Sequence, residues 1–107
     1  MGEANASLRL DKWLWYARFA KTRSLAARLC LSGDVAIAGV AVEKAHQSVR
    51  IGDILTLRFG RSLRRVEIQA LGERRGPPAE ARLLYRETQP PPPIPEREEW
   101  IPLIEPD

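Results

Sequence analysis

The chain has 107 residues, 44% of them hydrophobic, which allows one small domain with a core and leaves no room for a separate catalytic domain. Its net charge of +3 is unevenly distributed: residues 1–89 carry sixteen of the seventeen Lys and Arg residues, whereas residues 90–107 carry one base and five acids. No apolar run approaches the roughly 20 residues of a membrane span and the amino terminus does not resemble a signal peptide, so we expect a cytosolic protein without a membrane partner.

The first expected element is a helix that Ser7 caps, with Asp11 placed favourably in its opening turn. Its apolar residues recur at the i, i+3, i+4, i+7 spacing of one buried stripe: Leu10, Trp13, Leu14 and Ala17. Trp15 and Tyr16 fall away from this stripe, where they either pack against other parts of the chain or stack on a base.

A second helix is expected from Thr22, as its cap, to Gly33, which ends it in a left-handed conformation. The short connection around residues 20–21 predicts a tight corner between the two helices. Cys30 falls on the apolar side of this helix and reads as a buried, unreactive thiol. The other apolar residues of that side are Leu25, Ala26 and Leu29.

The two expected helices carry six cations between residues 8 and 28, against the single acid Asp11. These cations are Arg9, Lys12, Arg18, Lys21, Arg23 and Arg28. A cationic face is often only a solvated surface, but clustered Lys and Arg are also the electrostatic signature of nucleic-acid binding.

After Gly33 the pattern changes to strands. Residues 35–37 and 40–42 predict a tight hairpin around Ala38-Gly39, and residues 54–59 predict a strand that follows a turn at 49–53. Further along, Leu63, Val66, Ile68 and Ala70 alternate as in another strand.

Residues 72–78 read as a loop, and Pro77-Pro78 is expected to open a short helix that extends through Tyr85. The strand hairpin before this loop carries a second basic cluster at its tip, for which RNA contact and mere solubility are equally good explanations. Its members are Arg61, Arg64 and Arg65.

No arrangement of residues in the sequence predicts catalysis or a cofactor. Cys30 and His46 are the only cysteine and the only histidine, which argues against a metal site, and no nucleophile–base pair or glycine-rich phosphate loop is apparent. We therefore expect a protein that is not an enzyme and has neither catalytic residues nor cofactors.

Four segments in this order resemble the successive signatures of one family, the RNA-binding domain named after small-subunit ribosomal protein four (the S-four domain). They are residues 9–14 (RLDKWL), 21–26 (KTRSLA), 32–35 (SGDV) and 49–55 (VRIGDIL). The Trp13-Leu14-Trp15 continuation and residues 78–85 (PAEARLLY) resemble a narrower group, the fifteen-kilodalton heat-shock protein family. The resemblance covers about residues 8–89, leaving residues 90–107 as a proline-rich acidic tail.

The resemblance implies an α+β fold in which a two-helix RNA-binding face packs on a small antiparallel or mixed sheet, followed by a short carboxyl-terminal helix. It also implies binding of structured RNA, and for the narrower group binding of the large ribosomal subunit, particularly stalled subunits that retain a nascent chain on tRNA, which places the protein in ribosome rescue or the heat-shock response. With no dimerisation element apparent, we expect a monomer. The resemblance and the cationic pattern together assign RNA binding to Arg9, Lys12, Arg18, Lys21, Thr22, Arg23, Ser24, Arg28, Lys44 and Arg50.

The chain departs from the family pattern at Ala38, where an asparagine usually precedes the glycine of the hairpin and tolerates positive φ better. The tail stands where the narrower group has a longer basic helix, so no function of that helix transfers. The tail is either a solvated segment without function or, through its five acids, an electrostatic brake on RNA binding. Two alternatives remain. Residues 22–31 resemble the recognition helix of a DNA-binding helix-turn-helix protein, and the tail could be the ligand of a protein-interaction module.

Overall fold

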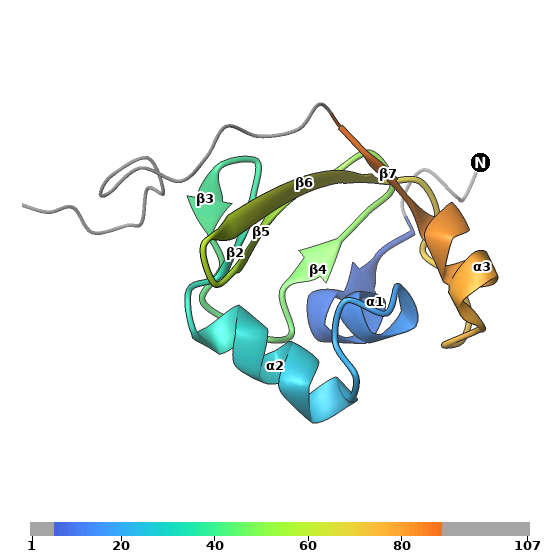
Figure 1. Ribbon diagram of the computed structural model, residues 1–107, viewed down its shortest axis with the longest axis horizontal. Helices are drawn as coiled ribbons and strands as arrows, with labels where there is room; N and C mark the ends of the chain where they lie inside the picture. Colours follow the sequence, from blue (N-terminus) through green and yellow to red (C-terminus); the bar gives the residue numbers. More distant parts are fainter. Residues whose placement is uncertain (1–5, 89–107) are drawn as a thin grey trace, which may run out of the picture.

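The computed structural model describes residues 6–88 of the chain, as a row of short elements (Figure 1). Their bounds in chain order are β1 Leu8–Arg9, α1 Leu10–Tyr16, α2 Arg23–Leu31, β2 Val35–Ile37, β3 Val40–Ala41, β4 Ser48–Val49, β5 Ile54–Phe59, β6 Ser62–Ile68, α3 Pro78–Ala81, a 3-10 helix Arg82–Leu84, and β7 Tyr85–Glu87. The predicted tail, residues 90–107, lies outside the described residues.

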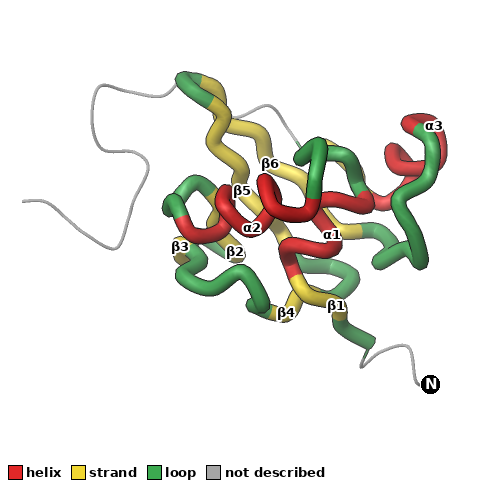
Figure 2. The backbone as a smooth tube through the Cα atoms, turned by 90° about the horizontal axis from the view of Figure 1, so that it is seen from below, coloured by secondary structure: helices red, strands yellow, loops and turns green. Residues whose placement is uncertain are grey.

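The strands form a five-stranded antiparallel sheet in the order β3-β2-β5-β6-β7 and a separate two-stranded sheet of β1 and β4. Figures 1 and 2 show that α1 and α2 cover one face of the larger sheet. The expected α+β architecture, with two helices on a small antiparallel sheet, is confirmed. The small β1–β4 sheet and strand β7 were not anticipated from the sequence.

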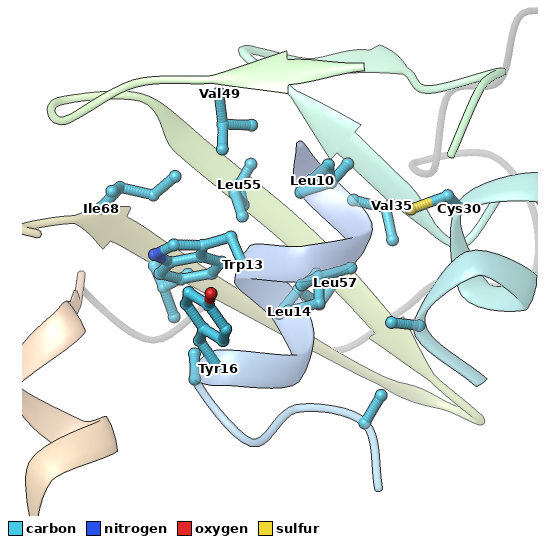
Figure 3. Packing of buried hydrophobic residues seen from close by; sticks show 14 of the residues in the cluster. Leu10, Trp13, Leu14, Tyr16, Cys30, Val35, Val49, Leu55, Leu57 and Ile68 are labelled. Atoms are coloured by element: carbon cyan, nitrogen blue, oxygen red, sulfur yellow. The ribbon is translucent and has the colours of Figure 1, made fainter. Parts of the chain in front are cut away.

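The core lies between α1 and the helix-facing side of β5 and β6 (Figure 3). The strands alternate as a half-buried sheet requires, since Leu55 and Leu57 of β5 and Val66 and Ile68 of β6 are buried. Trp13 of α1 is fully buried against them, as predicted, and its indole N–H donates to the carbonyl of Ala70 at 3.0 Å. A buried tryptophan with its polar atom satisfied fixes how α1 sits on the sheet.

The first helix begins differently from the prediction, because Arg9 and not Ser7 occupies its N-cap, and no side chain caps it. Its first free amides are satisfied by the chain before β4: Leu10 N–H donates to the carbonyl of Gln47 at 2.7 Å and Asp11 N–H to that of Ala45 at 3.3 Å. Long-range backbone hydrogen bonds therefore satisfy the helix amides for which the sequence predicted a local side-chain cap.

Two side chains on the helices also differ from the prediction. Tyr16, expected to point away from the apolar stripe, is only 7% exposed and belongs to the core, whereas Leu25, expected to be apolar packing, is 39% exposed. Tyr16 is the last residue of α1, and the chain at Gly72 passes close to its ring. The burial of Tyr16 depends on the corner after α1 and on the loop at 72–78, and the spacing of apolar residues along a helix encodes neither.

The ends of α2 are as predicted. The Thr22 hydroxyl accepts the backbone N–H of Leu25 at 3.1 Å, and Gly33 adopts a left-handed conformation with φ of +85° just beyond the helix. The connection from α1 contains one left-handed residue, Arg18, with φ of +65°.

The β2–β3 hairpin keeps a two-residue turn in which both residues have positive φ, +52° at Ala38 and +85° at Gly39. This is the conformation that favours asparagine followed by glycine, so alanine adopts a costly backbone geometry here without changing the turn.

The carboxyl-terminal helix is shorter than predicted. It ends at Ala81, and Tyr85, expected within it, begins β7, where it pairs with Ile68. The carbonyl of Leu84 accepts the N–H groups of both Gln69 and Ala70, which draws this segment onto the sheet edge. Strand pairing therefore overrides the helical spacing of this segment.

Candidate nucleic-acid interface

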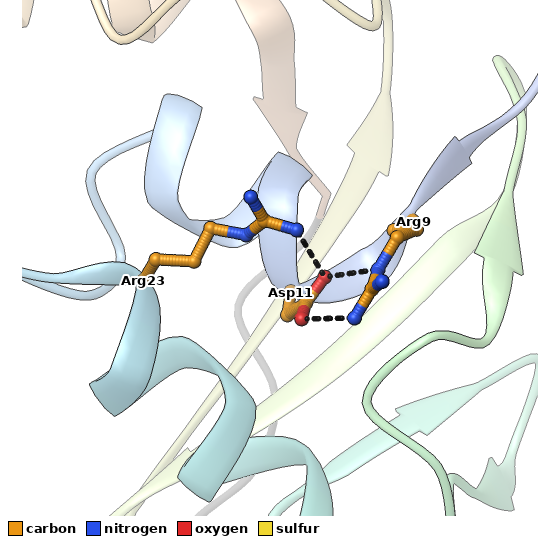
Figure 4. A network of polar contacts seen from close by, with 3 residues as sticks. All are labelled: Arg9, Asp11 and Arg23. Carbon is orange, nitrogen blue, oxygen red and sulfur yellow. Dashed lines mark hydrogen bonds and ion pairs between the residues drawn. The ribbon is translucent and has the colours of Figure 1, made fainter.

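The candidate interface is built around a buried carboxylate that joins β1, α1 and α2 (Figure 4). Asp11 of α1 is 3% exposed, yet it accepts hydrogen bonds from Arg9 Nε at 3.1 Å and Arg9 Nη2 at 2.9 Å. Arg23 Nη2, of the first residue of α2, lies 3.8 Å from Asp11 Oδ1, the oxygen that also accepts from Arg9 Nε. We call Arg9, Asp11 and Arg23 the arginine–aspartate cluster.

The cluster holds its two guanidinium groups while leaving them accessible. The side chains of Arg9 and Arg23 remain 51% and 43% exposed. The cluster therefore has a net charge of +1 and presents two oriented forks of N–H donors to solvent. Such forks match the oxygens of a phosphate group.

The amino terminus of α2 extends this surface, because residues 21–24 are all exposed. The Thr22 hydroxyl is occupied as acceptor of the helix cap, whereas the side chains of Ser24 and Lys21 make no hydrogen bond or ion pair within residues 6–88. Lys12 of α1 is partly buried, and its ammonium group lies 5.9 Å from the centre of the Tyr16 ring.

The loop residues Lys44 and Arg50 flank the segment that supports the start of α1. Lys44 immediately precedes Ala45, whose carbonyl accepts from Asp11 N–H, and Arg50 follows the strand paired with β1. These contacts bring the two residues to the neighbourhood of the arginine–aspartate cluster, and both are exposed there.

Arg18 has a different environment from the other predicted cations. Its Nε donates to the carbonyl of Gly76 at 2.8 Å, which ties the corner after α1 to the loop at 72–78. Arg75 makes the reciprocal tie, with Nε 3.1 Å from the carbonyl of Trp15 and Nη2 3.5 Å from that of Ala20. Arg75 was missed because only the tertiary structure carries its loop to the helical corner.

The same tie limits what Trp15 can do. Its ring lies 5.9 Å from the ring of Tyr16 and 5.9 Å from the Arg75 guanidinium. The buried Tyr16 does not have the exposed ring that base stacking requires, which corrects the placement predicted from the sequence.

The second basic cluster is divided by strand alternation. Arg64 lies on the helix-covered face, over the Phe19 ring at 5.1 Å and in a bidentate pair with Glu87 at 2.9 and 2.8 Å, which raises the pKa of Arg64 and lowers that of Glu87. Its neighbour Arg65 points to the opposite face, and Arg61 lies in the turn at the tip. The three do not form one surface.

Cys30 is buried, as predicted, and burial together with the charge of Asp11 raises the pKa of its thiol to about 12. In the described part of the chain, no three His, Cys, Asp or Glu side chains gather as metal ligands would. None of its helices has the length and apolarity needed to cross a membrane.

Comparison with known proteins gives one consistent group of relatives. Residues 8–55 match the family described as "S4 domain". The chain is 47% identical to heat shock protein 15 of Escherichia coli over 81 residues, which are 76% of this chain and 60% of that protein. It is 42% identical to the RQC P-site tRNA stabilizing factor of Halalkalibacterium halodurans over 66 residues, which are 62% of this chain and 74% of that protein.

A solved structure shares the fold as well. Heat shock protein 15 of Vibrio cholerae, described as trimeric, superposes with a TM-score of 0.72 and 43% identity, covering 78% of this chain and 83% of that one. The match to the Escherichia coli protein leaves about two fifths of that protein's length without a counterpart.

Proposed function

Because this chain belongs to the S4 domain family, in the group of heat shock protein 15, we propose that it is a non-enzymatic protein that binds ribosomal RNA of the large subunit during ribosome rescue or quality control. The arginine–aspartate cluster is the observation that carries this proposal. It brings two motif residues from different elements, Arg9 and Arg23, to one carboxylate and leaves both exposed.

The proposed contact is with phosphates of folded RNA. Two guanidinium groups held by Asp11 place their donors before the ligand arrives, which reduces the side-chain entropy lost on binding. Lys21 and Ser24 add donors beside them at the start of α2. Contacts of this kind position a protein by RNA shape and leave the base sequence unread.

The name of the Halalkalibacterium relative, a P-site tRNA stabilizing factor, suggests the ribosomal location. We propose that this chain binds at the same kind of site, on large subunits that retain tRNA, in the cytoplasm. We also keep the expectation that one copy suffices, because one chain supplies the entire cluster, although the Vibrio relative was solved as a trimer.

Co-sedimentation with purified large subunits, with and without stalled peptidyl-tRNA, tests this proposal. Arg23→Gln should weaken binding by about ten- to a hundredfold, since one charge-assisted phosphate contact contributes about 1.5–3 kcal/mol. Gln is chosen because a carboxylate at position 23 would face the buried Asp11 and destabilise the fold. Arg82→Gln is the matched control, an exposed arginine of the 3-10 helix whose side chain makes no hydrogen bond or ion pair within residues 6–88.

The salt dependence gives an independent measure of the same surface. If the surface neutralises about four to six phosphates, the log–log slope of affinity against salt should be about −3 to −5. A slope near zero, or a folded Arg23→Gln variant that binds as tightly as the native protein, would contradict the proposal. Equal affinity for random duplex DNA would revive the helix-turn-helix alternative, which the relatives above do not support.

A further inference from the structure

A surface groove lies beside α2, on the side of the helix that faces away from Arg23. Residues of α2 and of the segments next to its two ends follow one stripe, at spacings of four, seven, eight and eleven from the first: Lys21, Leu25, Arg28, Leu29 and Ser32. Together with Phe19, Ala20 and Asp34 they line an open hollow of about 560 Å³ whose surface is mainly apolar. Figure 2 shows α2 and the corner before it on the helical face of the sheet.

One wall of the groove is held in place by aromatic contacts. The ring of Phe19 lies 4.8 Å from that of Tyr85, 6.0 Å from that of Trp13 and 6.4 Å, stacked, from that of Phe59. The guanidinium of Arg64 covers it at 5.1 Å. The wall is therefore preformed, and a ligand does not have to order it.

The rim of the groove is cationic. Lys21 and Arg28 make no ion pair within residues 6–88, and both are exposed. The one acid of the lining, Asp34, has a carboxylate oxygen 2.7 Å from the hydroxyl of Ser32, which donates to it. An apolar floor between two uncompensated cations fits a ligand that has a flat apolar part joined to anionic groups.

We propose that this groove binds the base of an unpaired nucleotide in the same RNA, an inference that rests on the proposed function and extends it. A base offers a flat face to Leu25 and Leu29, while its flanking phosphates meet Lys21 and Arg28. The groove volume lies in the range of small-ligand sites.

Continuity with the arginine–aspartate cluster favours RNA over an acidic peptide. The cluster and the groove lie on the two flanks of the same helix, separated by about one helix diameter, roughly 10–12 Å. A strand whose phosphates lie on Arg9 and Arg23 can therefore pass over the start of α2 and place a neighbouring, unstacked base in the groove.

The test compares three RNA hairpins by fluorescence anisotropy: a perfect duplex, the same stem with a one-nucleotide bulge, and that bulge made abasic. The native protein should bind the bulged hairpin about five- to tenfold more tightly than the other two, the lower range for one stacked base. Leu25→Ser should remove this preference and leave affinity for the perfect duplex unchanged.

Leu31→Ser is the matched control, because Leu31 is 64% exposed on α2 and does not line the groove. It should retain the preference for the bulge. Both leucines are exposed, and thermal denaturation should show both variants folded.

Each contrary outcome has its own meaning. Equal binding of all three hairpins would overturn the base site and leave the proposed function standing, whereas binding to none of them would contradict the proposed function itself. If a peptide of residues 90–107 binds in a Leu25-dependent manner and the bulge does not, the groove accepts a peptide and the inference is wrong.

Discussion

Replacing Asp11 with asparagine tests two roles of the arginine–aspartate cluster, its contribution to stability and its contribution to RNA affinity. The amide keeps the size of the side chain but removes the charge that two arginines share. Asp11 is 3% exposed, so water does little to stabilise the charge of its carboxylate. Losing this charge should reduce both stability and RNA affinity. The exposure of the two arginines and the distances between the charges limit how large each effect can be.

The stability cost follows from the exposure of the partners. Two unit charges about 4 Å apart interact by about 4 kcal/mol at an effective dielectric constant of 20, before desolvation is counted. Because the Arg9 and Arg23 side chains are 51% and 43% exposed, both can return to water when the carboxylate is gone. We therefore expect Asp11→Asn to lower the free energy of unfolding by about 1–2 kcal/mol, less than the 3–5 kcal/mol typical of breaking a fully buried pair.

For RNA affinity two effects oppose each other. Removing a negative charge about 7 Å from a phosphate favours binding by about 0.6 kcal/mol in water, and salt screens even this. Freeing two arginine side chains costs about 0.5–1.5 kcal/mol each when they must be ordered again on binding. The second effect is larger, so affinity should fall by about two- to sixtyfold while the salt slope, which counts phosphates, stays unchanged.

Asp34→Asn is the control with the opposite sign. Asp34 borders the same basic surface but orders no arginine in the contacts described, since its carboxylate is bonded to the Ser32 hydroxyl. Its removal should leave affinity unchanged or slightly higher. Chemical denaturation gives the stability and anisotropy titration the affinity. Tighter RNA binding by a folded Asp11→Asn variant would refute the idea that Asp11 acts by orienting Arg9 and Arg23.

Other predictions test the fold and the surface around it. Ala38→Asn should stabilise the protein by about 0.5–1 kcal/mol in thermal unfolding, because Ala38 has φ of +52° and asparagine tolerates that conformation; no gain would mean that the turn is not strained. Thr22→Ala should cost about 1 kcal/mol through loss of the helix cap, and an unchanged melting temperature would contradict the cap. Since burial raises the pKa of Cys30 from about 9 to about 12, the protonated thiol stabilises the fold fully below pH 9, and this contribution should be lost as pH rises toward 12. Thiol reagents should modify Cys30 only after unfolding, so rapid modification at pH 8 would contradict the burial. Deleting residues 90–107, which carry five acids and one base, should raise RNA affinity at low salt, and an equal affinity there would rule out an electrostatic brake.

Features set by local chemistry were predictable from the sequence. The apolar spacing of Leu10, Trp13 and Leu14, the Thr22 cap and the left-handed Gly33 all appear where their residue types require them. Each depends on contacts within one helical turn or on the backbone freedom of a single residue. For the same reason the cationic character of residues 9–28 was apparent at once.

The tertiary structure decided which partners the charged residues have. From the sequence Asp11 was only an acid placed favourably at a helix start, and the approach of β1 and α2 makes it the buried partner of Arg9 and Arg23. Arg18 and Arg64 looked equivalent to the other cations until the 72–78 loop and β7 gave them carbonyl and carboxylate partners. Residue type determines how much charge a surface carries, but burial and long-range contacts determine which charges remain free for a ligand. Those contacts join positions up to about sixty residues apart, which no local pattern encodes.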